Sequence, residues 1–327
     1  MTKSKKQNPP LSKAEKTAVV FSAFLSVMLL KFPSIVGNAV TEALRSCATL
    51  LIPSLFPIMV ASEVAIGCGT IDIITLPLQG VLSKALGVKK EALSPYFLGL
   101  FGGYAASARG AILLYNNGII DKNECERLIS ISNMPSCAYL TGFVGAYVLK
   151  SKTLGWMLWL ICIASTIILS ALTKKKVQNT DTIPSVTSYS RVKNKLSFSK
   201  IFVDAISHSA SAMLIVCACV VFFSALISTL KLPLDHLSIS PILKEAILGS
   251  LEVTYGVLSC INIYDMIIRI ALTSFFIGWS GMCVHSQAIA MCEGMDLSFK
   301  SYFLLKLIQG LVCSVLAVIV YILVIKS

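Results

Sequence analysis

Charged residues are scarce in this sequence, and their scarcity excludes most soluble folds. Asp, Glu, Lys and Arg make up 13% of the 327 residues, whereas hydrophobic residues make up 56%. The mean hydropathy is +0.81. A soluble protein of this length could not bury so much apolar surface. The apolar residues also come in runs, not in the alternation of a transmembrane β-barrel. We therefore predict an all-α polytopic membrane protein.

Residues for metal, nucleotide or hydrolytic chemistry are also few. The 3 histidines are scattered, and none of the 11 cysteines forms a Cys-x-x-Cys pair, so a zinc site is not expected. The sequence contains neither Gly-x-x-x-x-Gly-Lys-[Ser/Thr] nor His-Glu-x-x-His. It offers no acid pair or Ser–His pair suited to an intramembrane hydrolase. We expect no enzyme activity, no metal and no cofactor, and we expect the cysteines to be small buried hydrophobes.

Most of the net positive charge is concentrated in two segments. Residues 1–18 carry five lysines against one glutamate, and residues 173–200 carry seven basic residues against one aspartate. Together they account for ten of the twelve net positive charges. The positive-inside bias places both segments in the cytoplasm. A nucleic-acid partner is not expected, because no aromatic residues are interleaved in a folded basic face.

Runs of about 20 apolar residues predict about seven spanning helices. They are Val19–Val36, Cys47–Cys68, Leu128–Leu149, Leu154–Leu172, Ile201–Leu230, Met266–Cys292 and Tyr302–Ile325. The first run lacks an Ala-x-Ala cleavage pattern, so we expect an uncleaved span. Asp72–Leu86 and Leu232–Leu243 are expected to be short interfacial helices or loops.

Two further apolar stretches, Ala92–Gly118 and Glu245–Asn262, have polar middles. The first contains Gly102–Gly110 with an arginine, and the second contains Gly249–Gly256 with a glutamate. Polar or irregular backbone at membrane depth is tolerated only where it is buried in protein or lines a wet cavity. We therefore predict two re-entrant hairpins of the kind that forms transporter sites.

The predicted membrane topology places these hairpins in the two halves of an inverted repeat. If Ala92–Gly118 enters and leaves on the same side, four spans precede the basic linker and leave it in the cytoplasm. Each half then reads span, hairpin, span, span, in opposite orientations. Thr41–Leu44 matches Val203–Ile206, and Lys90–Leu93 matches Lys244–Ile247. The predicted domains are 1–38 (basic N-terminus and first span), 39–172 (first repeat), 173–200 (linker) and 201–327 (second repeat).

The span after each hairpin carries helix breakers. Leu128–Leu149 contains Ser132-Asn133-Met134-Pro135, and Met266–Cys292 contains Gly278-Trp279-Ser280-Gly281. Proline removes a backbone donor, and glycine tolerates non-helical angles. We interpret both spans as unwound near a ligand site. The alternative is a proline kink and a glycine packing face, which are common in membrane helices.

Two charged residues in the hairpins have two interpretations each. Arg109 either binds a carboxylate as a guanidinium fork or pairs with Glu63 or snorkels to the interface. Glu252 either binds a coupling cation or proton, or forms an ion pair with Arg109 or His285.

Several stretches resemble a known family. They are Leu51–Pro57, Gly99–Gly118 with Asp121–Asn133, Leu251–Gly256 and Gly278–Gln287. Through them the chain resembles the YlbJ-type sporulation integral membrane proteins, which belong to the nucleoside-recognition or Gate-domain membrane proteins. The resemblance implies an architecture like that of concentrative nucleoside transporters. It also implies passage of dipicolinic acid from the mother cell toward the forespore across the outer forespore membrane. The first hairpin departs from the family pattern, because Ala105 stands where a proline is usual.

On this basis the expected solute site is drawn from both halves. Its residues are Gly102, Gly103, Tyr104, Ser107, Arg109, Ser132, Asn133, Glu252, Thr254, Tyr255, Ser280, Gly281, His285 and Gln287. The expected partners are a small anionic solute and the lipid bilayer; a coupling ion (Na⁺ or H⁺) and a homo-oligomer are compatible with the sequence. The alternatives are a non-transporting morphogenetic protein of the spore envelope, or a carrier of a nucleoside or another small carboxylate.

Overall fold

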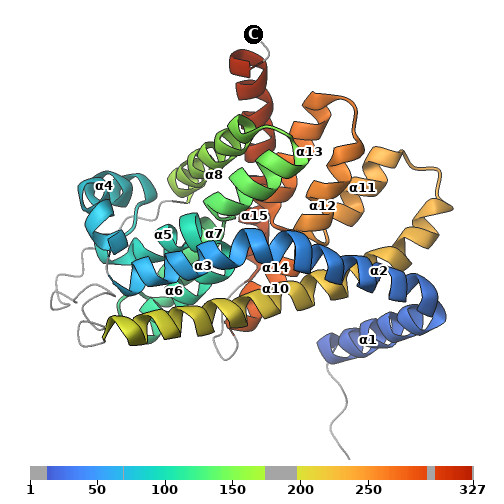
Figure 1. Ribbon diagram of the computed structural model, residues 1–327, viewed down its shortest axis with the longest axis horizontal. Coiled ribbons are helices and arrows are strands. Elements are labelled where there is room, and N and C mark those ends of the chain that lie inside the picture. The colour runs from blue at the N-terminus through green and yellow to red at the C-terminus, as the bar shows by residue number, and fades with distance from the viewer. Residues whose placement is uncertain (1–12, 69, 174–196, 293–298, 326–327) are drawn as a thin grey trace, which may run out of the picture.

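A computed structural model describes residues 13–68, 70–173, 197–292 and 299–325, and every regular element in these ranges is helical (Figure 1). The first half contains α1 (Lys13–Lys31), α2 (Pro33–Ser46), η1 (Cys47–Leu51), α3 (Ile52–Gly67), α4 (Thr70–Leu86), η2 (Lys90–Ala92), α5 (Ser94–Gly102), α6 (Tyr104–Asn116), α7 (Lys122–Ser132), η3 (Tyr139–Val148) and α8 (Lys152–Leu172). The second half contains α10 (Phe198–Asp235), α11 (Pro241–Gly249), α12 (Val253–Ser259), η4 (Cys260–Asn262), α13 (Met266–Trp279), α14 (Gly281–Met291), α15 (Phe299–Val320) and η5 (Tyr321–Ile325). Residues 1–12 and 174–196, which make up most of the two predicted basic segments, lie outside the described residues.

Among the described residues, five helices are long and apolar enough to cross a membrane. They are Pro33–Ala65, Lys152–Leu172, Phe198–Asp235, Met266–Met291 and Lys300–Val324. Val19–Lys31, Tyr139–Val148 and Val253–Asn262 are shorter apolar helices. Membrane-helix architecture is therefore confirmed, while the predicted number of about seven spans is not reproduced.

The first predicted span, Val19–Val36, is not one helix. α1 ends at Lys31, Phe32 adopts φ −126°, and α2 restarts with Pro33 in its first turn. The residue before a proline is disfavoured in the α region, whereas proline fits the start of a helix. The same Pro33 starts a helical stretch that runs through η1 and α3, so the second span is longer than Cys47–Cys68.

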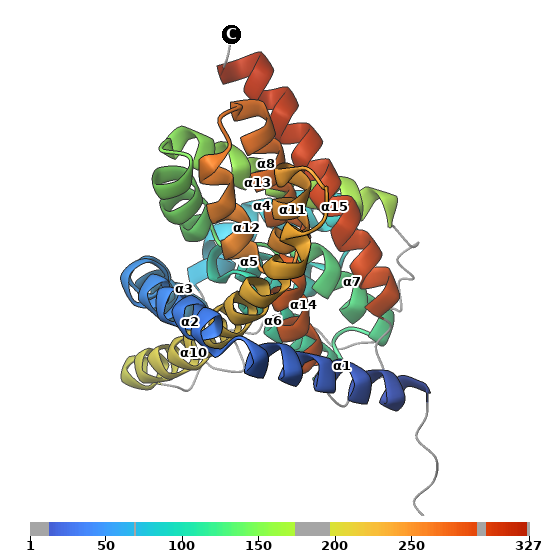
Figure 2. The ribbon, with the colours of Figure 1, turned by 90° about the vertical axis from the view of Figure 1, so that its right-hand side faces the viewer.

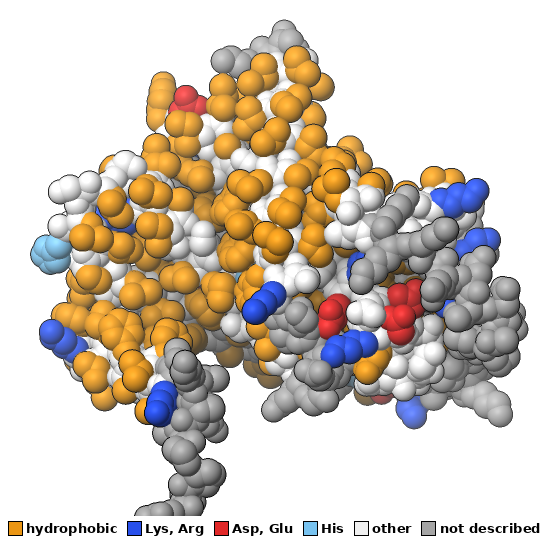
Figure 3. Space-filling model, turned by 180° about the vertical axis from the view of Figure 1, so that it is seen from behind, with side chains coloured by type: hydrophobic (Ala, Val, Ile, Leu, Met, Phe, Trp, Pro, Cys, Tyr) orange, Lys and Arg blue, Asp and Glu red, His pale blue; other side chains and the backbone are white. Residues whose placement is uncertain are grey.

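Large apolar side chains remain exposed along these helices. Leu214 on α10 is 71% exposed and Leu30 on α1 is 79% exposed. Figure 3 shows hydrophobic side chains over a broad part of one face. Soluble monomers rarely expose so large an apolar surface, so this exposure fits contact with lipid.

Apart from α4 and η2, a similar order of elements occurs in both halves. In the first, α3 is followed by α4 and η2, which have no counterpart in the second half, and then by a helical hairpin (α5 and α6), a broken helix (α7 and η3) and α8. In the second, α10 is followed by a helical hairpin (α11 and α12), a broken helix (α13 and α14) and α15. Both predicted hairpin segments form a helix, a turn and a second helix. That they re-enter the membrane, that the halves form an inverted repeat, and the predicted domain boundaries all stay predictions.

The second hairpin begins earlier than predicted. Pro241 starts α11, and the Ser240 hydroxyl accepts a hydrogen bond from the Leu243 amide at 3.3 Å. A serine N-cap followed by proline is a favoured helix start. α10 extends to Asp235, so Leu232–Leu243 is divided between two helices and is not a separate interfacial element.

Long helices from the two halves lie side by side. α10 packs against α2 and α3 and runs in the opposite direction (Figure 1). α15 packs along α13 of its own half and against α7 and α8 of the first half (Figure 2). The two halves therefore share one core, and the interruptions of their broken helices lie inside it.

Candidate functional site

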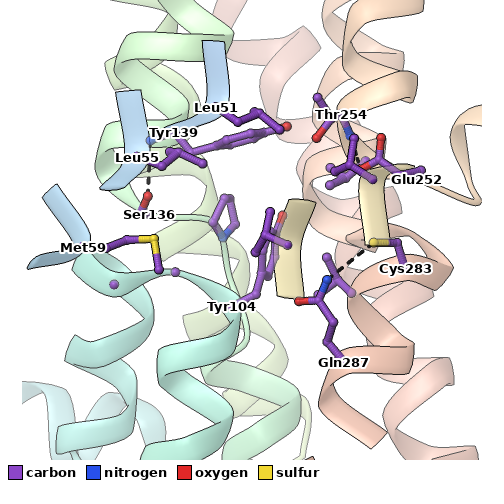
Figure 4. Close-up of a pocket in the computed structure, with 17 residues that line it drawn as sticks. Leu51, Leu55, Met59, Tyr104, Ser136, Tyr139, Glu252, Thr254, Cys283 and Gln287 are labelled. Carbon is purple, nitrogen blue, oxygen red and sulfur yellow. Dashed lines mark hydrogen bonds between the residues drawn. The ribbon is translucent and has the colours of Figure 1, made fainter. Parts of the chain in front are cut away.

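A cavity lies where the two hairpins and the two broken helices meet. Its volume is about 90 Å³. On this scale one water needs about 10–15 Å³, so the cavity could accommodate several waters or a small solute. Its lining comes from both halves: Leu51, Leu55, Met59, Gly102, Gly103, Tyr104, Pro135, Ser136, Tyr139, Val216, Val220, Glu252, Val253, Thr254, Cys283, Val284 and Gln287. Figure 4 shows the labelled residues of α3 on one side and those of α12 and α14 opposite them.

The turn of the first hairpin forms part of the lining. Gly103 has φ +81°, a conformation that side chains disfavour, and it allows α5 to turn directly into α6. Close packing holds this hairpin in place: a Cβ on Gly99 would lie 2.1 Å from the carbonyl oxygen of Ser132. The Ser107 and Ser132 hydroxyls are 2.7 Å apart. The hairpin is therefore fixed to the end of α7, where the first broken helix is interrupted.

The first broken helix unwinds where the sequence predicted. α7 ends at Ser132 and η3 begins at Tyr139, with Pro135 between them. The Ser136 hydroxyl accepts a hydrogen bond from the Tyr139 amide at 3.2 Å, which caps the second segment. Tyr139 is 6% exposed, and its buried hydroxyl has no hydrogen-bond partner in the part of the chain that the structure describes. In Figure 4 this side chain extends toward Thr254, so it offers an unused donor to the cavity.

Glu252 forms the turn of the second hairpin and is 1% exposed. Its carboxylate accepts hydrogen bonds from the amides of Thr254 at 2.9 Å and Tyr255 at 2.6 Å. These bonds cap the start of α12, where a negative charge is favoured by the helix dipole. Among the described residues no ion pair joins it to a basic group, so a pair with Arg109 or His285 is not observed. Backbone amides stabilise the carboxylate instead.

The second broken helix also unwinds as predicted. α13 ends at Trp279, Ser280 adopts the left-handed conformation with φ +77°, and Gly281 follows with φ +78°. The amides of Met282 and Cys283 donate to the carbonyl oxygens of Ser250 and Leu251 at 3.1 and 2.9 Å. The first free amides of α14 are thus used by the second hairpin and do not face a ligand in this conformation.

The predicted site residues fall into three groups. Those that line the cavity are Gly102, Gly103, Tyr104, Glu252, Thr254 and Gln287. Those that are buried outside its lining are Ser107, Ser132, Asn133, Ser280, Gly281 and His285. Arg109 and Tyr255 line other cavities.

The position of Arg109 favours its structural interpretation. Its Nη2 lies 2.7 Å from Oε1 of Glu63, which joins the first hairpin to α3. This pair borders a separate cavity of about 370 Å³, which His208 also lines. The pairing with Glu63 is therefore the alternative that the structure shows, and the central cavity contains neither residue. Tyr255 similarly donates its hydroxyl to Glu245 at 3.0 Å, within the second hairpin.

Two residues near the cavity had no assigned role from the sequence. Tyr139 lines it, and Lys306 on α15 is fully buried next to the first broken helix. The Lys306 ammonium donates to the carbonyl oxygen of Asn133 at 2.6 Å and to Oε1 of Gln309 at 2.7 Å. A lysine followed one turn later by a glutamine inside an apolar run is a usable sequence signal, since ionisable groups in spans are commonly functional.

Similarity to known proteins agrees with this architecture. The chain is 24% identical over 337 aligned positions to the sporulation integral membrane protein YlbJ of Bacillus subtilis (strain 168), covering 92% of this chain and 81% of that protein. The chain is similar to the YlbJ-type sporulation membrane proteins. No protein-family model matches it, and no solved structure matches it. Together with the five long apolar helices, the similarity to YlbJ identifies a multi-pass integral membrane protein.

Proposed function

We propose that this chain carries a small aromatic acid across a membrane through the central cavity, and that dipicolinic acid is the first candidate solute. The observation that carries the proposal is the meeting of two hairpins and two broken helices at one cavity. Carriers commonly bind their solutes where discontinuous helices from two repeats meet. The similarity to a sporulation integral membrane protein supports a role in sporulation. Movement from the mother cell to the forespore across the outer forespore membrane is part of the proposal.

The cavity suits a planar ring better than a free dianion. Tyr104 and Tyr139 supply aromatic surface, while Tyr139, Thr254 and Gln287 supply polar groups. No Lys or Arg is among the described residues that line it, and the Glu252 carboxylate is part of its wall. An uncompensated dianion in such a place would be costly. We therefore propose that the acid is carried with its charge compensated, by protons or by a cation that enters with it.

The same lining favours a second candidate, an uncharged solute such as a nucleoside. A nucleoside has an aromatic base and hydroxyl groups that match an apolar cavity with hydroxyl and amide side chains. It needs no basic residue. The lack of Lys and Arg in the cavity lining is the specific observation that favours it.

Uptake into vesicles that contain the purified protein tests these candidates. Labelled dipicolinate and labelled uridine are offered separately, each against empty vesicles. Tyr139→Phe and Thr254→Val should each lower uptake of the true solute by about 5- to 10-fold, because a lost hydrogen bond costs about 1–1.5 kcal/mol. Tyr264→Phe is the matched control, since Tyr264 is fully exposed.

The outcomes separate the competing functions. Uptake of dipicolinate that falls in the cavity variants supports the first candidate, and uptake of uridine with the same pattern supports the second. If Arg109→Ala abolishes uptake while the cavity variants do not change it, the solute site is at Arg109. No uptake of either solute by correctly folded protein would favour a non-transporting morphogenetic role.

A further inference from the structure

A buried lysine lies at the end of α7, at the break in the first broken helix, and the described residues include no acidic partner for it. Lys306 is 0% exposed. Among the residues that the structure describes, none of the ion pairs includes it. A buried ammonium is costly unless nearby groups compensate its charge. Its oxygen partners must therefore provide this compensation.

Both partners are neutral oxygen atoms. The carbonyl oxygen of Asn133 is 2.6 Å from Nζ, and Oε1 of Gln309 is 2.7 Å from it. Asn133 caps the C-terminus of α7, where the helix dipole is negative. The chain then unwinds through Pro135, so this carbonyl is not used by a continuing helix. The ammonium is thus located where a helix end attracts a cation.

This arrangement resembles a site for an alkali cation. In carriers with broken helices, carbonyl groups at the C-terminal ends of half-helices commonly coordinate Na⁺ or a proton. Backbone and amide oxygens are also ligands that hard cations prefer. We propose that the ammonium of Lys306 is a built-in cation that fills such a position at the end of α7, so that this protein does not require Na⁺.

The surrounding hydrogen bonds explain why the position is structurally important. Asn133 donates from Nδ2 to the Tyr302 hydroxyl at 2.8 Å, and Nδ1 of His285 lies 3.0 Å from the same hydroxyl. This chain of bonds joins the end of the first broken helix to α14 of the second. Gln309 extends the network by donating to Ser165 on α8 at 3.5 Å. A cation at Lys306 therefore holds elements of both halves together beside the cavity.

Thermal unfolding of the purified protein in Na⁺, K⁺ and choline chloride, at equal ionic strength, tests the inference. The wild-type Tm should be the same in the three salts. Lys306→Ala should have a lower Tm in choline, and Na⁺ or K⁺ should then raise it by about 3 °C or more in a saturable way. The substitution leaves the Asn133 and Gln309 oxygens and free volume for a cation. Lys200→Ala is the control, because Lys200 is an exposed lysine whose loss should not create a cation response.

A specific stabilisation of the wild-type protein by Na⁺ would overturn the inference, as would a folded Lys306→Ala variant that does not respond to either cation. The wild-type comparison remains decisive if the variant does not fold. Only the statement that transport does not require Na⁺ rests on the proposed function. The melting assay needs no solute, so a failure of the cation inference is distinguishable from a failure of the proposed carrier function.

Discussion

At the scale of single residues, the second broken helix contains a strained serine. Ser280 adopts φ +77°, which is uncommon for a residue other than glycine. Among the described residues, its buried hydroxyl has no hydrogen-bond partner. Such strain is commonly stored at functional sites. It lies next to the turn that places Cys283, Val284 and Gln287 along the cavity.

Replacing this serine with glycine should make the protein more stable. Ser280→Gly removes both the left-handed strain and the unsatisfied hydroxyl, which we expect to raise stability by about 1 kcal/mol. Thermal unfolding in detergent checks this result. Solute uptake should fall at the same time if the strain serves the site. A lower Tm would show that the hydroxyl has an essential partner.

At the scale of elements, the first hairpin depends on its close approach to α7. A methyl group on Gly99 would lie 2.1 Å from the Ser132 carbonyl oxygen, which no side-chain movement can relieve. Gly99→Ala should therefore shift the hairpin and destabilise the protein by about 1–3 kcal/mol. Gly37→Ala is a matched control, because nothing lies within 4 Å of its added Cβ and alanine favours the helix. Equal melting temperatures for the two variants would contradict this packing.

The ion pair between the first hairpin and α3 should be detected as coupling between two substitutions. Arg109 and Glu63 side chains are 37% and 17% exposed, so screening limits the energy of their pair to about 1 kcal/mol. In a double-mutant cycle of Arg109→Gln and Glu63→Gln, the double variant should be at least as stable as the less stable of the two single variants. Thermal unfolding at low and high salt gives the measurement. Strictly additive losses would mean that the two side chains act separately.

At the scale of the whole molecule, the order of elements repeats in the two halves and predicts a topology. If the first hairpin enters and leaves on one side, Lys90 and Asn117 face the same compartment. Cysteines placed at these positions, in a background without the native cysteines, should react with an impermeant maleimide from the same side of sealed vesicles. Labelling from opposite sides would contradict both the re-entrant hairpin and the inverted repeat.

The sequence by itself determined the elements whose causes are local. Apolar runs predicted the membrane helices, because lipid requires apolar side chains along a whole span. Pro135 and Gly281 predicted both interruptions, because each changes the backbone at its own position. Pro33 is the same kind of local signal and predicts the break after Lys31. The prediction of Val19–Val36 as one continuous span was therefore wrong.

Only the tertiary structure decided which side chains meet. Arg109 and Glu252 were both charged residues in polar hairpins, yet one pairs with Glu63 and the other caps its own helix. Lys306 contacts Asn133 across 173 residues of sequence. Such partners are chosen by how the helices of two halves pack, and hydropathy and helix breakers carry no information about that choice. The folded arrangement of neutral oxygens, not the position of the lysine in the sequence, makes its buried charge tolerable.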